Sequence, residues 1–319
     1  MDRSYLPEGM RLGSAENREA CASLAGLERA MHTGTVLEGM VRLCDHAMDL
    51  HVDVGGFEGI IPYNEAVFNP DGQPVKDIAV LSRVGKPVCF RVIGIARNGP
   101  TGKPTLMLSR RAAQIDCYES YLSGLCAGDI IPARVTHLES FGAFLDVGCG
   151  LVSLLSVDQI SVSRIDHPRA RLYTGMELRV AVKTVDTAHR RLYVTLRELL
   201  GTWEQNAARF AVGQTVTGIV RSVESYGVFV ELAPNLAGLT ELREEQKADA
   251  HRWVGQSAAV FIKSILPERM KIKLVLIDTY PTASSAPPLH YYVPEDVGHL
   301  SRWVYSPATC RKRVETLFD

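Results

Sequence analysis

Two pairs of aromatic residues occupy matching places in the chain and are suited to binding nucleic-acid bases. Phe141 and Phe144 lie on either side of a glycine, and Tyr226 and Phe229 repeat this spacing farther along. If the second ring of each pair lies on a strand, it alternates with apolar neighbours and points to the polar side of a half-buried sheet. An exposed ring offers a stacking surface worth roughly 1–3 kcal/mol per base, whatever the base. The spacing therefore predicts binding to an unpaired nucleic-acid strand, whose bases are free to stack.

Acidic residues share the polar side of these two expected strands. Asp146 follows Phe144 by two positions, and Glu231 follows Phe229 in the same way. Side chains two residues apart leave the same side of a strand. We therefore expect both carboxylates at the solvent surface beside the rings.

Basic residues near the rings could hold the phosphate backbone of a bound strand. Around the first pair of rings the candidates are Arg134, Arg179, Lys183, Arg190 and Arg191. Around the second pair, the outward positions of the last two expected strands are Phe261, Lys263, Lys271 and Lys273. An alternative is that the rings plug the end of a barrel or cover an adjoining helix. The occurrence of the same pair at two equivalent places favours the binding role.

No catalytic or metal-binding motif accompanies these residues. The sequence contains no Gly-x-x-x-x-Gly-Lys-Ser/Thr loop, no His-Glu-x-x-His and no Gly-x-Ser-x-Gly. Its seven cysteines are scattered and form no Cys-x-x-Cys pair, which argues against a zinc site and a disulfide framework. We expect a protein that is not an enzyme and has no cofactor and no metal.

Composition narrows the class of protein further. A net charge of −1 argues against a basic protein that coats polyanions, but it is compatible with binding through stacking and a few local cations. The chain has no run of about 18 apolar residues and no signal-peptide core at its start. We therefore expect a cytoplasmic protein with no membrane partner.

Short β-like runs separated by glycine-rich turns are the elements that must position these side chains. Gly128 and Gly213 open two similar segments 85 residues apart, and Gly34 opens a third, more divergent one. Each segment holds five short strands with a longer excursion between the third and fourth, which favours a five-stranded OB barrel over a sandwich. The expected fold class is mainly β, with three tandem OB barrels joined by short helices, an N-terminal helix and a C-terminal appendage. The expected units are 1–33 (N-terminal helix), 34–110 (barrel 1), 111–127 (helical linker), 128–197 (barrel 2), 198–211 (helical linker), 212–278 (barrel 3) and 279–319 (linker and appendage).

The motifs of these segments resemble the S-one RNA-binding domain, a family of OB-fold modules. The second segment carries the closest match, in Phe141–Gly148 and Val185–Leu196. The third matches well, including Leu266–Leu276, and the first is recognisable through Val52–Pro62. Together the three segments cover most of the chain, from residue 34 to residue 278.

The resemblance implies an RNA face in each barrel, made of two aromatic residues, a histidine, an aspartate and a basic residue. The matching positions hold Phe141, Phe144, Ser153, Asp186 and Arg191 in the second segment, and Tyr226, Phe229, Glu241, Leu266 and Lys271 in the third. In the first segment, Met48 and His51 stand at the aromatic positions and Pro62 at the histidine position. The rings and the basic residue are thus kept in barrels 2 and 3, whereas the histidine is absent from all three. We expect barrel 1 to pack on barrel 2 or to hold a protein partner.

The two ends of the chain lie outside the matching segments. Ser14–Met31 predicts one amphipathic helix with Ser14 as N-cap and Gly34 at its end, which either packs on barrel 1 or docks a partner protein. The C-terminal region has too many aromatic residues for a free tail, and we expect it to fold back on barrel 3. Whether it covers Phe229 or extends the RNA surface with its basic residues is left open.

The resemblance also implies a task. The ribosomal protein that gives the family its name suggests that this chain holds single-stranded messenger RNA at the small ribosomal subunit. The N-terminal helix or barrel 1 would be the docking end. Two alternatives stay open: a free RNA-binding regulator that does not attach to the ribosome, and a protein-interaction scaffold that has lost RNA binding.

Overall fold

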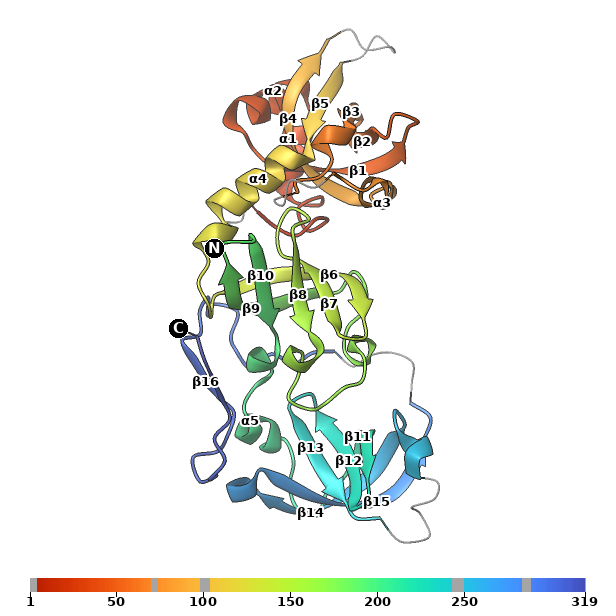
Figure 1. Ribbon diagram of the computed structural model, residues 1–319, viewed down its shortest axis with the longest axis vertical. Helices are drawn as coiled ribbons and strands as arrows, with labels where there is room; N and C mark the ends of the chain where they lie inside the picture. The colour runs from red at the N-terminus through yellow and green to blue at the C-terminus, as the bar shows by residue number, and fades with distance from the viewer. Residues whose placement is uncertain (1–4, 70–73, 98–103, 243–249, 283–287, 319) are drawn as a thin grey trace.

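The computed structural model describes residues 5–69, 74–97, 104–242, 250–282 and 288–318. Figure 1 shows an elongated molecule in which three small barrels follow one another along the long axis in chain order. The helices lie between the barrels or at their ends, and no layer of helices covers a sheet. Within the described residues, no helix is both long enough and apolar enough to cross a lipid bilayer.

Each barrel is a closed sheet of five strands, which confirms the expected fold class. Barrel 1 consists of β1 (Leu37–Cys44), β2 (Leu50–Val54), β3 (Phe57–Ile61), β4 (Pro87–Ala96) and β5 (Thr105–Ser109). Barrel 2 consists of β6 (Ile130–Glu139), β7 (Gly142–Asp146), β8 (Val152–Ser156), β9 (Glu177–Asp186) and β10 (Arg191–Thr195). Barrel 3 consists of β11 (Thr215–Glu224), β12 (Gly227–Ala233), β13 (Leu236–Thr240), β14 (Ser257–Leu266) and β15 (Lys271–Tyr280). The third strand of each barrel pairs in parallel with the fifth, and the described pairings are otherwise antiparallel.

The barrels close because their strands alternate apolar and polar residues. In β2, Leu50, Val52 and Val54 are fully or almost fully buried, while His51 and Asp53 between them are partly exposed. This period of two places one side of each strand in the barrel and the other outside. The core of barrel 2 continues into the helix before it, where Ala113 and Cys117 are buried.

The helices are short, two before barrel 1, one between β3 and β4 of barrel 1, and one at each joint between barrels. They are α1 (Ala15–Cys21), α2 (Leu24–Thr33), α3 (Asp77–Leu81), α4 (Arg110–Ser120) and α5 (Trp203–Ala207). Single 3-10 turns lie at 63–65, 122–124, 157–159, 168–170, 197–200, 250–253 and 267–269.

The N-terminal segment forms two helices instead of the single one expected. Ser14 caps α1 as predicted, because its side chain accepts a hydrogen bond from the Asn17 amide. Ser23 then caps a second helix in the same manner, by accepting from the Gly26 amide. A serine in an extended conformation inside the apolar stripe thus starts a new helix. Gly34, in the left-handed region at φ 69°, ends α2 as predicted.

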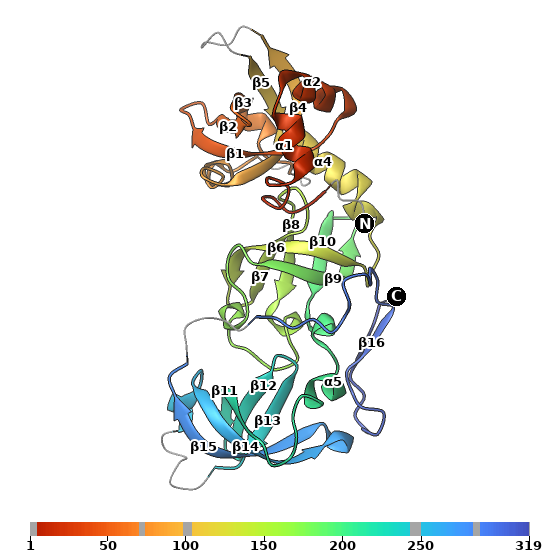
Figure 2. The same ribbon diagram turned by 180° about the vertical axis from the view of Figure 1, so that it is seen from behind.

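The C-terminal segment runs back along two barrels, not only along barrel 3 as expected (Figure 2). On barrel 2, the Ile130 amide donates to the Gly298 carbonyl, and the Leu300 amide donates to the Gly128 carbonyl. On barrel 3, the Tyr305 hydroxyl donates to the Asn235 carbonyl. The segment ends in a two-stranded ribbon of β16 (Arg302–Val304) and β17 (Glu315–Leu317). It ties barrels 2 and 3 together. The linker expected after Asp278 starts later than predicted, since β15 continues to Tyr280, and its residues 283–287 lie outside the described part.

Candidate nucleic-acid interface

Barrel 2 carries a pair of aromatic rings on its outer surface. Phe141 lies in the turn between β6 and β7, and Phe144 follows on β7. The Phe141 side chain is 55% exposed, and its ring meets that of Phe144 edge to face, with centroids 6.0 Å apart and planes at 89°. Such an arrangement is a favourable contact between aromatic rings. It holds Phe141 up from the barrel surface, where a base can reach it.

The ring of Phe144 begins a row of side chains that crosses three strands. Phe144 pairs with Leu154 on β8, and Leu154 pairs with Tyr193 on β10. Directly paired residues point to the same side of a sheet. Tyr193 therefore adds a second aromatic residue to this row. It is not among the residues predicted from the sequence, although Tyr193 alternates with buried Leu192 and Val194.

His137 is a further ring that the sequence analysis missed. It pairs with Phe144 across β6 and β7, and the two rings are stacked with centroids 6.3 Å apart. Its Nε2 lies 2.6 Å from a carboxylate oxygen of Glu139. His137 thus extends the aromatic surface toward the edge of barrel 2.

Barrel 3 repeats this geometry. The rings of Tyr226 and Phe229 have centroids 6.2 Å apart and planes at 88°, and Tyr226 is 61% exposed. Phe229 pairs with Leu239, which pairs in turn with Lys273. The row that ends in a tyrosine in barrel 2 therefore ends in a lysine in barrel 3.

The other predicted residues of barrel 3 are also at its surface. Phe261 is 37% exposed and pairs with Val275. Because Val275 lies two residues after Lys273 on β15, Phe261 faces the same side as Lys273. Lys271 is exposed at the start of β15.

Two of the predicted lysines are presented by β-bulges. In barrel 2, Lys183 is the extra residue between two ladder pairs of β9 and β10. Lys263 occupies the same position between β14 and β15 of barrel 3. In barrel 1 this position holds Ile93, which is exposed. A bulged residue has no partner in the ladder. Both lysines are exposed and precede the residue that pairs with the end of the row, Thr184 with Tyr193 and Ser264 with Lys273.

Two of the other predicted residues of barrel 2 form hydrogen bonds within the barrel. Ser153 is buried, and its hydroxyl donates to the Leu192 carbonyl at 2.6 Å, which corrects the expectation that it faces RNA. Asp186 accepts from the amide and from Nδ1 of His189, and these bonds lower the pKa of its carboxyl. It therefore fixes the hairpin between β9 and β10. Arg191 is exposed where β10 begins.

Three arginines proposed as phosphate ligands lie at the joints. The guanidinium of Arg190 stacks on the rings of Phe68 and Tyr118, at 5.7 and 5.4 Å from their centroids. Arg134 donates to the Glu8 carbonyl at 2.9 Å. Arg179 donates to the carbonyls of 293 and 294 in the C-terminal segment, at 2.9 and 2.7 Å. Arg134 and Arg179 thus bind backbone carbonyls of other segments, which corrects the expectation that they hold phosphates.

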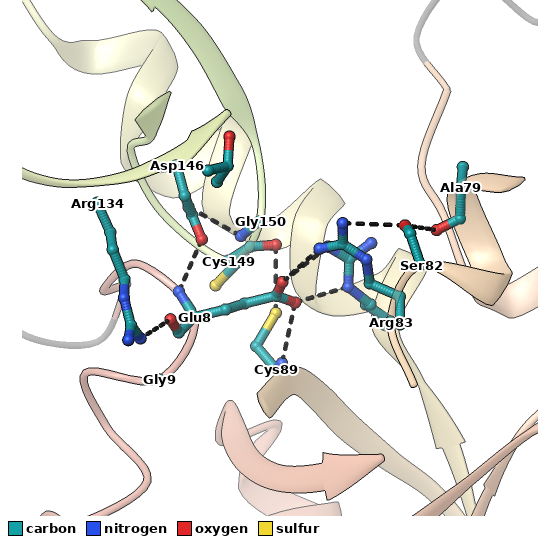
Figure 3. A network of polar contacts seen from close by, with 12 residues as sticks. Glu8, Gly9, Ala79, Ser82, Arg83, Cys89, Arg134, Asp146, Cys149 and Gly150 are labelled. Carbon is teal, nitrogen blue, oxygen red and sulfur yellow. Dashed lines mark hydrogen bonds and ion pairs between the residues drawn. The ribbon is translucent and has the colours of Figure 1, made fainter. Parts of the chain in front are cut away.

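The two carboxylates expected beside the rings are buried instead. Figure 3 shows Asp146 at the joint between barrels 1 and 2, where it accepts from the Glu8 amide at 2.7 Å. Burial and the charge of Glu8 raise the pKa of Asp146 to about 7. Glu231 lies at the joint between barrels 2 and 3, paired with fully buried Arg171 and with Arg221. Barrels 2 and 3 thus use the same strand position for a buried contact with the part of the chain that precedes them, Glu8 for Asp146 and Arg171 for Glu231.

Barrel 1 presents a different surface at the equivalent positions. His51 stands where barrel 2 has Phe144, and its ring nitrogens lie 3.3 Å from Asp45 and 3.1 Å from Glu58. Burial lowers the pKa of His51, but the hydrogen bonds to the two carboxylates outweigh it, and the pKa is raised. This face is acidic and lacks a pair of exposed rings, so it does not suit an RNA strand.

The middle of the chain matches a known family of domains. Residues 125–197, which include all of barrel 2, match the family model described as "S1 RNA binding domain". The metal-ligating residue types His, Cys, Asp and Glu form no group of three suited to a metal ion within the described residues.

Longer stretches resemble ribosomal proteins. The chain is 30% identical to "Small ribosomal subunit protein bS1 homolog" of Bacillus subtilis, over 68% of this chain and 55% of that protein. It is 25% identical to "Small ribosomal subunit protein bS1" of Rhizobium meliloti, over 72% of this chain and 40% of that protein. The chain therefore spans about half the length of these relatives, or less. A multidomain protein with nucleic acid binding domains from Streptococcus pneumoniae aligns over 76% of this chain and 73% of its own at 17% identity, with a TM-score of 0.24. That score is too low to support an argument.

Proposed function

Because residues 125–197 are an S1 RNA binding domain, we propose that this chain binds single-stranded RNA through the outer faces of barrels 2 and 3. Bases stack on Phe141 and Phe144 in barrel 2 and on Tyr226 and Phe229 in barrel 3. Lys183, Lys263, Lys271 and Lys273 hold the phosphates beside them. The strand must be unpaired, since a base inside a duplex cannot lie on a ring.

The observation that carries this proposal is the recurrence of one arrangement of rings. Both pairs meet edge to face at almost the same separation and angle, although one pair is Phe–Phe and the other Tyr–Phe. The leading ring of each pair is more than half exposed. Rings that only filled a barrel end would be covered by neighbouring side chains, and these are not.

The names of the relatives suggest where this binding is used. We propose that the chain holds messenger RNA at the small ribosomal subunit, in the cytoplasm, without catalysing a reaction. Barrel 1 and the N-terminal helices are the docking end, because the acidic row around His51 is unsuited to RNA. The RNA-binding end is formed by barrels 2 and 3.

Two measurements test the proposal. Fluorescence anisotropy with a short unstructured RNA should show saturable binding that weakens with added salt, and a duplex of the same sequence should bind more weakly. Sedimentation with small ribosomal subunits at moderate salt should recover the chain in the subunit fraction. RNA binding without sedimentation would identify a free RNA-binding regulator, whereas sedimentation without RNA binding would identify a protein-interaction scaffold.

A further inference from the structure

A cleft of about 590 Å³ lies between barrels 1 and 2, and its lining does not include the rings of Phe141 and Phe144. Its walls come from three parts of the chain: the turn between α3 and β4, the helix α4 with the loop that contains Phe68, and the end of barrel 2 that faces barrel 1. Clefts of 300–1,000 Å³ are the usual size of small-molecule sites. The volume is sufficient for one nucleotide.

The wall contributed by barrel 2 has an apolar part and a polar part. The apolar part consists of Val135, Val147, Leu151, Val185 and Leu192, and the polar part includes Arg134, Thr136, Asp146 and the turn at 189–191. The side chain of Tyr118 borders the same space from α4. A flat, weakly polar group such as a nucleic-acid base is suited to such a surface.

The rim of the cleft is strongly basic. Six Arg or Lys side chains and two carboxylates are among the described residues that line it, in a chain with a net charge of −1. Both carboxylates are already engaged (Figure 3). Glu8 accepts from Arg110 at 2.6 and 3.0 Å, and Asp146 accepts from the Gly148 amide at 2.9 Å. Glu8 is also shared with Arg83, whose Nη1 lies 3.4 Å from it, so neither carboxylate is left to pair with Lys86 or Arg190.

Two of these cations, and one unpaired donor of a third, are available to an anion. The exposed ammonium of Lys86 has no carboxylate within 4.0 Å in the described part of the chain. Arg190 lies over two rings, and no ion pair with a carboxylate is formed by its guanidinium among the described residues. The Nε of Arg83 is buried and has no hydrogen-bond acceptor among the described residues. An unsatisfied buried donor of this kind points to a missing partner.

We propose that this cleft binds one nucleotide of the RNA, with the base against the apolar wall and the phosphate at the rim near Lys86, Arg83 and Arg190. The proposal rests on the proposed function, since the nucleotide belongs to the strand that stacks on barrel 2. The cleft and the ring of Phe144 are linked by neighbouring residues of barrel 2. Thr136 lines the cleft, and its hydroxyl donates to the carbonyl of Phe144 at 2.9 Å.

Photo-cross-linking of the full chain to RNA tests this site. An unstructured RNA of about 20 nucleotides carrying 4-thiouridine, longer than one OB barrel usually covers, should cross-link to the peptides of Phe68 or Tyr118 as well as to that of Phe144. Lys86→Glu should abolish the cleft cross-links, weaken binding roughly threefold to tenfold, and reduce the slope of log K against log salt by about 0.7. Arg190→Gln keeps a planar group over the two rings and should have a similar but smaller effect. Lys76→Glu, the same change at an exposed site of barrel 1 outside the cleft, should alter none of these quantities.

The outcomes separate this inference from the proposed function. Wild-type binding with cross-links at Phe144 alone, and equal affinities for Lys86→Glu and Lys76→Glu, would overturn the inference and leave the proposed function standing. No RNA binding by the wild type would refute the proposed function and the inference together. If adenosine monophosphate bound in the cleft and was lost in Lys86→Glu, while RNA cross-linked only at the rings, the site would belong to a free nucleotide and the assignment to RNA would be wrong.

Discussion

Replacement of Glu8 by glutamine should loosen the joint between barrels 1 and 2. The Glu8 carboxylate accepts from Arg110 at 2.6 and 3.0 Å, from the Cys89 amide at 3.2 Å and from Arg83 at 3.4 Å. Arg110 is only 3% exposed. Glu8→Gln therefore leaves a buried guanidinium without its counter-charge, and removal of one partner from such a pair costs roughly 3–5 kcal/mol.

The position of the tryptophans allows a specific readout. All three, Trp203, Trp253 and Trp303, lie in or against barrel 3 or the segment packed on it. Tryptophan fluorescence therefore reports the unfolding of barrel 3, whereas far-ultraviolet circular dichroism reports all three barrels. With a urea m-value of about 2 kcal/mol/M, Glu8→Gln should lower the midpoint of the dichroism transition of barrels 1 and 2 by roughly 2 M. The fluorescence transition should shift by much less, because barrel 3 contacts barrel 2 but not the Glu8 network.

Two companion variants make this prediction refutable. Glu8→Leu with Arg110→Met should recover part of the loss, because apolar residues of similar volume often replace a buried ion pair without cost, although the Cys89 amide and Arg83 still lose their acceptor. Glu315→Gln breaks an ion pair whose Arg302 is half exposed, and should leave the transition midpoints almost unchanged. If Glu8→Gln destabilised the chain no more than Glu315→Gln does, the structural role given to the Glu8 network would be wrong.

Three further predictions concern pH, the bulges and the second joint. Burial, the main cause, raises the pKa of Glu38 to about 7. Because the unfolded chain loses this proton near pH 4.5, the stability of the folded chain should fall as the pH rises from 4.5 to 7. In melts at successive pH values, Glu38→Gln should reduce this fall by up to roughly 3 kcal/mol. In anisotropy titrations, Lys183→Glu should weaken RNA binding and lower the slope of log K against log salt, whereas Ile93→Glu at the equivalent bulge of barrel 1 should change neither. Equal effects of the two substitutions would show that the bulged lysines do not bind RNA. Glu231→Gln leaves Arg171 buried without its partner and should cost roughly 3–5 kcal/mol in the fluorescence transition of barrel 3, and an unchanged transition would refute the role of this pair.

The strands and the rings were predictable because both depend on local sequence. Period-two alternation defines which side of a strand is buried in its own barrel, and the 85-residue repeat places Tyr226 where Phe141 stands. The same alternation placed Asp146 and Glu231 at the solvent surface. It distinguishes the inside of a barrel from its outside, but it does not show that the preceding part of the chain covers part of the outside.

Other features depend on contacts distant in the sequence. The C-terminal segment reaches barrel 2 through backbone hydrogen bonds between 298–300 and 128–130, which no side-chain pattern marks. Tyr193 joins the ring row only through a parallel pairing with β8. Ser153 matches the histidine position of the family, but its small side chain turns inward to the Leu192 carbonyl.

Alanine replacement of the ring pairs tests the central claim most directly. Anisotropy titration of a short unstructured RNA would compare the wild type with Phe141→Ala/Phe144→Ala and with Tyr226→Ala/Phe229→Ala. Tyr173→Ala, which removes an exposed ring outside both rows, is the control. If each pair stacks at least one base, each double variant should lose about 1–3 kcal/mol, or roughly five- to 150-fold in affinity, while the control binds like the wild type. Unchanged affinity in both double variants would contradict the stacking interface.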